Sequence, residues 1–280
     1  MKRIAGYSLT GSTKEEKLFF FYGPGGNGKS KFVNALAACA GDYAVNAAME
    51  AFVERRGERH GTDIAALVGA RLVTASETEK GRYWDEALIG RLVGGDPVTA
   101  RFMRRDNFTY QPQFTLLILG NHQPELSSVN EANRRRVVII PFLYQPTKPD
   151  EDLADKLRAE YPAILHWMIE GAHDWYEYGL GEMPEAVRAE TEDYFEDQNY
   201  VKAWIDECCL AGPNYTETSL NLSASWERWS KRNGVSAGSQ KTLIQALKEA
   251  TPMQEGPLFH TPRTQGHRGA GGIAAGSAYG

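Results

Sequence analysis

The stretch LFFFYGPGGNGKS, residues 18–30, decides the fold of this chain. Its first part, Leu18 to Tyr22, is a short and continuously apolar run that ends at a glycine, which is typical of a strand buried on both faces of a parallel sheet. After the glycine-rich part, Lys31 to Ala40 has apolar residues at helical spacing and stops at Gly41, as a helix does. The stretch therefore predicts a strand, a loop and a helix in succession.

The loop fits the pattern G-x-x-x-x-G-K-[ST] of phosphate-binding loops. Glycines let the backbone curl so that successive N–H groups point at phosphate oxygens, and the positive end of the following helix adds to the attraction. Lys29 would reach the β- and γ-phosphates of ATP, and the Ser30 hydroxyl would ligate Mg²⁺. The alternative is a glycine-rich turn that matches by chance. The expected nucleotide-binding residues are Gly23, Pro24, Gly25, Gly26, Asn27, Gly28, Lys29 and Ser30.

Apolar runs further along the chain predict three more strands, with a helical pattern between the first two. The strands are expected at residues 71–75, 114–119 and 137–140, and the helix at about 85–93. Strands that alternate with helices indicate a wound α/β sheet. Residues 1–148 are therefore expected to form a P-loop ATPase core around a central parallel sheet.

Helical patterns replace strand patterns beyond Asp150. An acidic helical connector is expected over residues 149–198, with helices at 152–161, 163–178 and 184–197. A small winged-helix-like domain is expected over residues 199–280, with helices at 201–208, 223–229 and 240–249 and a glycine-rich, partly extended end. Ala274 to Gly280 are expected to be a frayed tail.

ATP hydrolysis needs a second carboxylate that helps to hold Mg²⁺ or activates water, and this group usually follows a neighbouring strand. Glu77 comes directly after the run LVTAS and fits that role, so Ser30 and Glu77 are the expected metal ligands. Glu79 and Asp85 are nearby substitutes. An ordinary solvated glutamate at a strand end is the alternative interpretation.

Two further elements fit an ATPase. Asn121 follows the predicted strand 114–119, where an amide could orient the attacking water, because ligands gather at the carboxyl ends of parallel strands. Asn121 could also simply start a turn. The run Arg134 to Arg136 directly precedes an apolar strand, and one of these residues could act as an arginine finger on a neighbouring subunit's ATP. A solvated basic turn is the alternative.

The segment Gly94 to Tyr110 predicts a β-hairpin with a basic tip flanked by aromatic residues. Arg101, Arg104 and Arg105 are the candidate DNA-binding residues, since such a tip can contact single-stranded DNA through phosphate charge and base stacking. A solvent-facing hairpin without a ligand is the alternative.

Five stretches in this order make the pattern specific. They are GPGGNGKS, LVTASETEKG, LIGRLVGGDPVTARF, LILGNHQP and NRRRVVIIPF. The chain resembles the superfamily 3 helicases, and most closely the C-terminal helicase part of phage and plasmid primases related to the poxvirus primase-helicase. The likeness runs from about Gly6 to the C-terminal region.

The resemblance implies an AAA+-like core that assembles into hexameric rings and translocates on a DNA strand with ATP hydrolysis. It also implies that the phosphate-binding loop is Walker A, that Glu77 is the Walker B acid and that Asn121 is sensor 1. The trans-acting arginine would come from the pair Arg135 and Arg136. Arg136 is favoured, because in related helicases the finger stands six residues before the residue that closes the next strand, here Phe142.

Three features depart from that family. Many relatives carry a lysine where this chain has Arg91, and a tryptophan or tyrosine where it has Arg134; guanidinium and ammonium groups are not interchangeable. About twenty residues precede the loop, so the primase module and the collar domain are expected to be missing. Primer synthesis would then need a separately encoded primase as partner.

Composition sets the broad class of the protein. A chain of 280 residues with 42% hydrophobic content can bury a core, which excludes a disulfide-stapled miniprotein and a disordered tail. Its 3 cysteines are too few and too badly spaced for a disulfide framework or a zinc site. No early apolar run approaches the roughly 20 residues that span a bilayer. A soluble cytoplasmic protein without a membrane partner is expected, in the bacterial host if a phage or prophage encodes it.

The formal net charge of −5 argues weakly against a nucleic-acid binder. The charge is uneven, however: residues 1–145 hold 19 basic against 15 acidic side chains, residues 146–210 hold 5 against 17, and residues 211–280 hold 7 against 4. DNA contact is therefore expected through local basic features with steep salt dependence, while the acidic connector faces away from DNA.

Together these features predict an ATP-dependent, Mg²⁺-requiring DNA helicase motor that acts as a ring on single-stranded or forked duplex DNA. One alternative is a DNA-dependent ATPase that remodels replication proteins without unwinding. Another is a truncated DNA-binding accessory module that binds ATP weakly.

Overall fold

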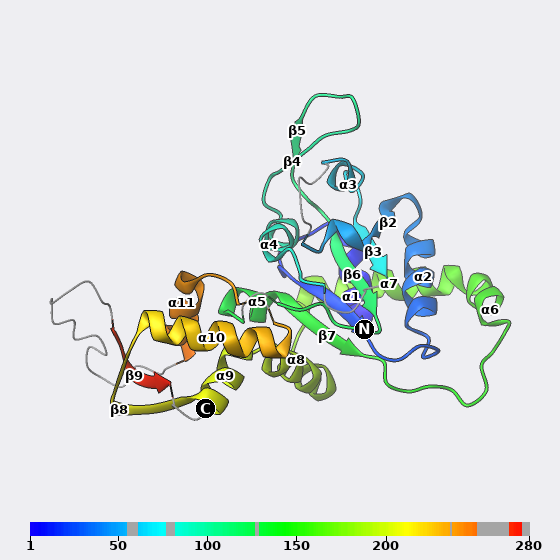
Figure 1. Cartoon of the computed structure of the whole chain (residues 1–280). Helices are drawn as coiled ribbons and strands as arrows, with labels where there is room; N and C mark the ends of the chain where they lie inside the picture. Colours follow the sequence, from blue (N-terminus) through cyan, green and yellow to red (C-terminus); the bar gives the residue numbers. More distant parts are fainter. Residues whose placement is uncertain (55–60, 77–81, 127–128, 236, 251–268, 276–280) are drawn as a thin grey trace. The chain divides into compact units, whose positions relative to one another are not determined.

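A computed structural model describes residues 1–54, 61–76, 82–126, 129–235, 237–250 and 269–275 (Figure 1). The chain forms two compact units, one made of residues 1–126 with 131–194 and the other of residues 127–130 with 195–280. The limits expected for a core, a connector and a C-terminal domain stay predictions. No described helix is long and apolar enough to cross a membrane.

A parallel sheet of five strands forms the centre of the first unit, as the sequence predicts for an α/β fold. The strand order is β2-β3-β6-β1-β7. The strands are β1 (Leu18–Tyr22), β2 (Ala44–Ala48), β3 (Leu72–Ser76), β6 (Thr115–Gly120) and β7 (Val137–Pro141). β1, β3, β6 and β7 are apolar and almost entirely buried, which is why their sequences read as continuous runs rather than alternating ones.

Helices cover one face of this sheet with a continuous apolar core. Alternate residues of β1, β6 and β7, among them Phe19, Leu117 and Val138, pack against α1 (Lys2–Thr10), α2 (Lys29–Ala40) and α7 (Tyr161–Tyr178). The first unit also contains α3 (Thr62–Ala65), α4 (Glu86–Gly94), α5 (Glu131–Arg136), α6 (Leu153–Ala159) and most of α8 (Glu185–Asp197).

Several elements of the first unit escaped the sequence prediction, among them β2 and α1. β2 has the sequence AVNAA and is only half buried at the sheet edge, so it lacks the apolar run that marks the other strands. α1 packs so closely on α7 that a Cβ on Gly6 would meet the Ala172 nitrogen at 1.9 Å, and one on Gly171 would meet the Lys2 oxygen at 2.1 Å. This close approach depends on the partner helix, which is distant in sequence.

The three arginines before β7 also differ from expectation. Arg134, Arg135 and Arg136 form the last turn of the short helix α5 and not a basic turn. α2 likewise begins at Lys29, two residues before the predicted start, because the phosphate-loop residues Lys29 and Ser30 are already helical.

α8 covers the exposed edge of the sheet at β7. The backbone N–H of Ile139 donates to the Thr191 hydroxyl at 3.0 Å, and this hydroxyl donates to the Val187 carbonyl at 2.6 Å. The side chain thus satisfies an edge-strand amide that would otherwise remain buried without a partner.

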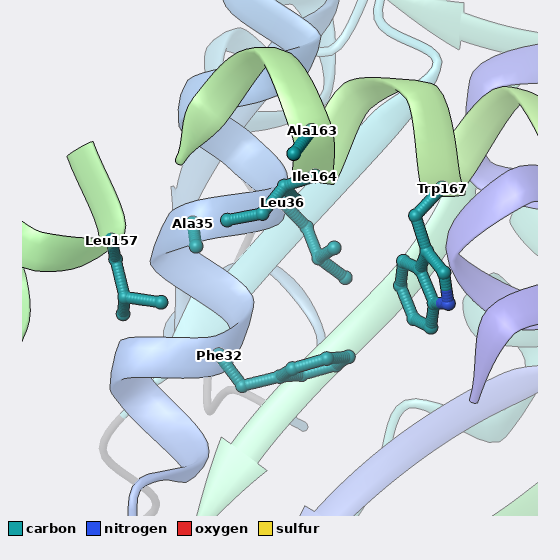
Figure 2. A pocket seen from close by; sticks show the side chains of 7 residues that line it. All are labelled: Phe32, Ala35, Leu36, Leu157, Ala163, Ile164 and Trp167. Carbon is teal, nitrogen blue, oxygen red and sulfur yellow. The ribbon is translucent and has the colours of Figure 1, made fainter. Parts of the chain in front are cut away.

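An apolar cavity of about 340 Å³ lies between α2, α6 and α7 (Figure 2). Its lining residues are Phe32, Ala35, Leu36, Leu157, Ala163, Ile164 and Trp167. These side chains carry no charge that could hold a phosphate, whereas the glycine-rich loop lies at the amino end of α2.

The second unit has its own core of three tryptophans. Trp204, Trp226 and Trp229 pack together within α9 (Tyr200–Cys208) and α10 (Ser219–Asn233), and α11 (Gln240–Ala250) adds Leu243 and Leu247. The predicted helices are present. Whether this unit is a winged helix stays a prediction.

An antiparallel pair of strands, β8 (Cys209–Thr218) and β9 (Gly269–Ala275), completes the second unit. Ala274 and Ala275, predicted to lie in a frayed tail, instead pair with Leu210 and Cys209; the rest of that predicted tail lies outside the described residues. β8 was not foreseen because it contains Gly-Pro, which usually marks a turn; its register shifts between Ala211 and Thr216.

Candidate functional site

The glycine-rich loop joins the carboxyl end of β1 to the first residue of α2. Gly23, Gly26 and Gly28 have φ values of 145°, 77° and 86°, which side chains rarely allow. Gly28 is also the N-cap of α2 and brings no capping side chain. The loop therefore curls as a phosphate-binding loop does and presents the positive end of a 12-residue helix.

Lys29 is folded back into this loop and is only 6% exposed. Its ammonium group donates to the carbonyls of Gly23 at 2.9 Å and Pro24 at 3.0 Å, and to the Asn27 side-chain oxygen at 3.4 Å. A fourth acceptor is the side-chain oxygen of Asn121, at 2.7 Å. Burial lowers the pKa of Lys29, while these four oxygens hold its ammonium group inside the loop.

The sheet brings Asn121 to this loop. β6 pairs with β1 in parallel, so that Gly120 is level with Tyr22, and the next residues of both strands emerge at the same edge. Predicted site residues 92 positions apart in sequence are thus in hydrogen-bond contact. Ligands of open parallel sheets bind in this place, outside the carboxyl ends of the strands.

The chain after β7 forms another wall of the loop, which sequence reasoning missed. Asn27 donates a side-chain hydrogen bond to the Phe142 carbonyl, and Gln145 donates to the Gly25 carbonyl at 2.5 Å. A Cβ on Gly23 would lie 2.2 Å from the Phe142 oxygen, so this approach requires glycine. The strand predicted at 137–140 was the one sequence signal near this wall, but the sequence does not show that this strand pairs with β1.

The carboxylates of the predicted site are only partly described. Glu77 and Glu79 lie outside the described residues; β3 ends at Ser76, level with Leu119 of β6, and thus at the same sheet edge as Asn121. Asp85 caps α4, because its carboxylate accepts from the Leu88 N–H at 2.9 Å. Among the described residues no three His, Cys, Asp or Glu side chains form a metal-binding group.

Ser30 is the candidate Mg²⁺ ligand that the structure describes. It follows Lys29 in the first turn of α2 and is exposed. A hydroxyl oxygen beside bound phosphates suits Mg²⁺, which keeps several waters and takes few protein ligands. The exposed Ser30 hydroxyl therefore fits the role of a single protein ligand to such an ion.

Arg135 and Arg136 lie at the amino ends of the parallel strands, whereas Lys29 lies beyond their carboxyl ends. They precede β7, and Val137 pairs with Leu18 at the start of β1, whereas the loop follows the end of β1. The guanidinium of Arg136 packs against Gly90 of α4, and an Nε of this 21%-exposed side chain has no hydrogen-bond partner within the described chain. Arg135 is more exposed and lies 3.6 Å from Glu16.

The predicted hairpin is confirmed as an antiparallel pair, β4 (Val98–Ala100) and β5 (Phe108–Tyr110). Arg101, Arg104 and Arg105 lie on its exposed tip, which projects at the top of Figure 1. The rings of Phe102 and Phe108 stack at 5.4 Å across the base of this tip. The structure does not bring the three arginines to Lys29 and Asn121 as one cluster.

The chain is similar to one protein family and to several viral proteins. Residues 21–136 match the family described as "Family of unknown function (DUF5906)". Three viral proteins, each named "Putative helicase", are similar in sequence. Identity is 27% over 173 residues for Acanthamoeba polyphaga mimivirus, 25% over 236 for Sputnik virophage and 20% over 270 for Frog virus 3.

The matched regions cover 60%, 71% and 88% of this chain, respectively, but only 18%, 30% and 27% of those relatives. Among solved structures, an apo form of the NrS-1 C-terminal region matches with a TM-score of 0.52 and 12% identity, covering 88% of this chain and 57% of that one. At that identity the match shows a shared fold.

Proposed function

We propose that this chain is the ATP-hydrolysing motor of a DNA helicase of superfamily 3 type. The observation that carries the proposal is the 2.7 Å contact between Lys29 and Asn121 inside a curled glycine loop at the carboxyl ends of β1 and β6. The viral relatives named as helicases support the same class of protein.

In this proposal residues 23–30 bind the triphosphate of ATP through loop amides and the positive end of α2. Lys29 neutralises charge on the β- and γ-phosphates, and Ser30 with Glu77 holds the Mg²⁺. Asp85 is the weaker substitute for Glu77 because its carboxylate already caps α4. Bound Mg²⁺ would supply charge neutralisation on the phosphates. Asn121 orients the attacking water beside the γ-phosphate.

Arg136 acts on the ATP of a neighbouring subunit. It is at least five strand positions from its own loop, which at about 3.3 Å per residue is roughly 16 Å along β1. An arginine side chain does not span that distance, so a finger role requires a second copy of the chain. We therefore propose the ring assembly, a hexamer, that the family resemblance implies, with Arg136 of each subunit at the ATP of the next.

The hairpin β4–β5 provides the DNA contact. Arg101, Arg104 and Arg105 would bind phosphates of single-stranded or forked DNA, and hydrolysis would move the tip along the strand. The remodelling ATPase and the accessory DNA-binding module remain the competing functions. The accessory module would depend on a separately encoded primase as its partner.

Rates of ATP hydrolysis and of forked-duplex unwinding, with and without single-stranded DNA, test the proposal. DNA-stimulated hydrolysis with unwinding is expected, and both should disappear in Lys29→Ala and Arg136→Ala proteins. Hydrolysis without unwinding would favour the remodelling ATPase. A lack of DNA-stimulated hydrolysis at every protein concentration would refute both enzyme functions and leave the accessory module.

A further inference from the structure

A buried tyrosine near the end of α8 joins two loops of the candidate site. Tyr194 is 2% exposed, and its hydroxyl makes two hydrogen bonds. It accepts from the Trp84 indole N–H at 3.0 Å and donates to the Pro124 carbonyl at 2.7 Å. One phenol group therefore bridges two residues that are 40 positions apart and that both come well before it in the sequence.

Both partners belong to segments that leave the carboxyl edge of the sheet. Trp84 follows the segment after β3 that carries Glu77, and Pro124 is three residues beyond Asn121. The two segments also pair through their backbones: the Trp84 N–H donates to the Glu125 carbonyl at 3.0 Å, and the Glu125 N–H donates to the Arg82 carbonyl at 2.8 Å. The backbone bonds among Arg82, Trp84 and Glu125, together with the Tyr194 bonds to Trp84 and Pro124, form what we call the clamp.

The clamp is also packed against the strand that leads to the phosphate-binding loop. The Trp84 ring meets the Phe20 ring edge-on, with centroids 5.9 Å apart, and both side chains are buried. Phe20 is in the middle of β1, three residues before Gly23. The clamp therefore fixes the Asn121 loop relative to the same strand from which the Lys29 loop emerges.

We propose that Tyr194 is a positioning residue for ATP hydrolysis, which holds Asn121 against Lys29 by fixing the Pro124 end of the loop. The inference rests on the proposed function. Pro124 is only three residues after Asn121, and the fixed φ of proline stiffens the Pro124 end of the loop. Loss of the hydroxyl should relax this end, so that Asn121 occupies its productive position for less of the time.

A purely structural role predicts a different result. In that case the hydroxyl only satisfies two buried polar groups, and its loss would lower stability without a specific effect on the chemical step. Thr191 supplies a matched control, because it is in the same helix and its buried hydroxyl bonds the edge strand β7 at Ile139 rather than either loop. Tyr194→Phe and Thr191→Val each delete one buried hydroxyl from α8.

The test compares steady-state ATP hydrolysis of the full chain at saturating single-stranded DNA. For Tyr194→Phe we expect kcat to fall by about tenfold, as displacement of a positioning contact does, with KM for ATP within about twofold of wild type. Both variants should lower the melting temperature by a few degrees, but Thr191→Val should leave kcat unchanged. Combined with Asn121→Ala, Tyr194→Phe should cause no further fall in kcat, because the residue that it positions is already gone.

The outcomes separate the two proposals. An active wild type with an unchanged kcat in Tyr194→Phe would overturn the positioning role alone. An equal fall in kcat in Thr191→Val would also overturn the positioning role. The same would follow if Tyr194→Phe lowered kcat by a further tenfold in the Asn121→Ala protein. An inactive wild type would instead overturn the proposed function, and the positioning role with it.

Discussion

The ammonium nitrogen of Lys29 lies 2.7 Å from the side-chain oxygen of Asn121, although 92 residues separate the two in sequence. The contact exists because β6 pairs directly with β1 and both strands end at the same edge. In the proposed function this cation and this neutral amide both face the triphosphate of ATP, where the amide would add polarity without repelling the anion.

Replacement of Lys29 should abolish hydrolysis. In Lys29→Ala the γ-phosphate loses its buried cation, so we expect ATP hydrolysis to fall by about 100-fold or more. The control is Lys31→Ala, which removes an exposed lysine from the same turn of α2. The two variants are compared by phosphate release; equal activity in both would contradict a role for Lys29.

A negative charge at Asn121 should weaken nucleotide binding. In Asn121→Asp the new carboxylate would pair with Lys29 and repel the triphosphate, and we expect the Kd for ATP to rise by about tenfold or more. Gln123→Glu adds the same charge two residues further along the loop and should change the Kd much less. Titration with a fluorescent ATP analogue measures both, and unchanged binding in Asn121→Asp would place Asn121 away from the phosphates.

Arg136 should act across a subunit boundary. Arg136→Ala protein and Lys29→Ala protein are each expected to be inactive, whereas an equal mixture should recover activity, because about a quarter of randomly formed head-to-tail interfaces would combine an intact Lys29 with an intact Arg136. The control is Arg134→Ala, which removes an exposed arginine two residues before Arg136 in the same helix and should leave the protein active. An inactive mixture that still forms mixed rings would argue against a shared site.

The hairpin arginines should govern the salt dependence of DNA binding. Each phosphate contact to single-stranded DNA contributes a slope of about −0.7 to log K against log salt concentration. The double variant Arg104→Ala/Arg105→Ala should therefore bind more weakly and with a shallower slope. Arg158→Ala, an exposed arginine of α6 paired with Asp155, serves as the control and should leave the slope unchanged.

Alkaline pH should destabilise the first unit through two tyrosines. Burial raises the pKa of Tyr7 and of Tyr110 to about 12, from 10.0 in an unfolded chain. Between these values the unfolded state binds fewer protons than the folded state, so stability is retained below pH 10 and falls as the pH rises toward 12. Tyr7→Phe should make this fall shallower, as urea unfolding across the range would show. An unaltered slope would contradict the assigned pKa of Tyr7.

Local sequence predicted those elements whose signals lie within neighbouring residues. The apolar runs of β1, β3, β6 and β7 and the glycine loop before α2 were recognisable because each is buried on both faces or requires glycine backbone angles. β2 and α1 were missed, since β2 is half exposed and α1 owes its tight packing to α7. The helix α5, which carries Arg134 to Arg136, was not predicted, because a helix of six residues has too little periodicity to detect.

The sequence by itself therefore determined the residue types of the loop: glycines where the backbone must curl, followed by the lysine and the serine to which the proposed function gives the phosphate and the metal. Only the tertiary structure decided which distant groups meet it. The pairing of β6 with β1 places Asn121 on Lys29, the position of β7 leaves Arg136 at the far edge, and the Tyr194 hydroxyl joins two loops. Strand order and helix docking depend on contacts between residues far apart in the chain, which local patterns of hydrophobicity do not encode.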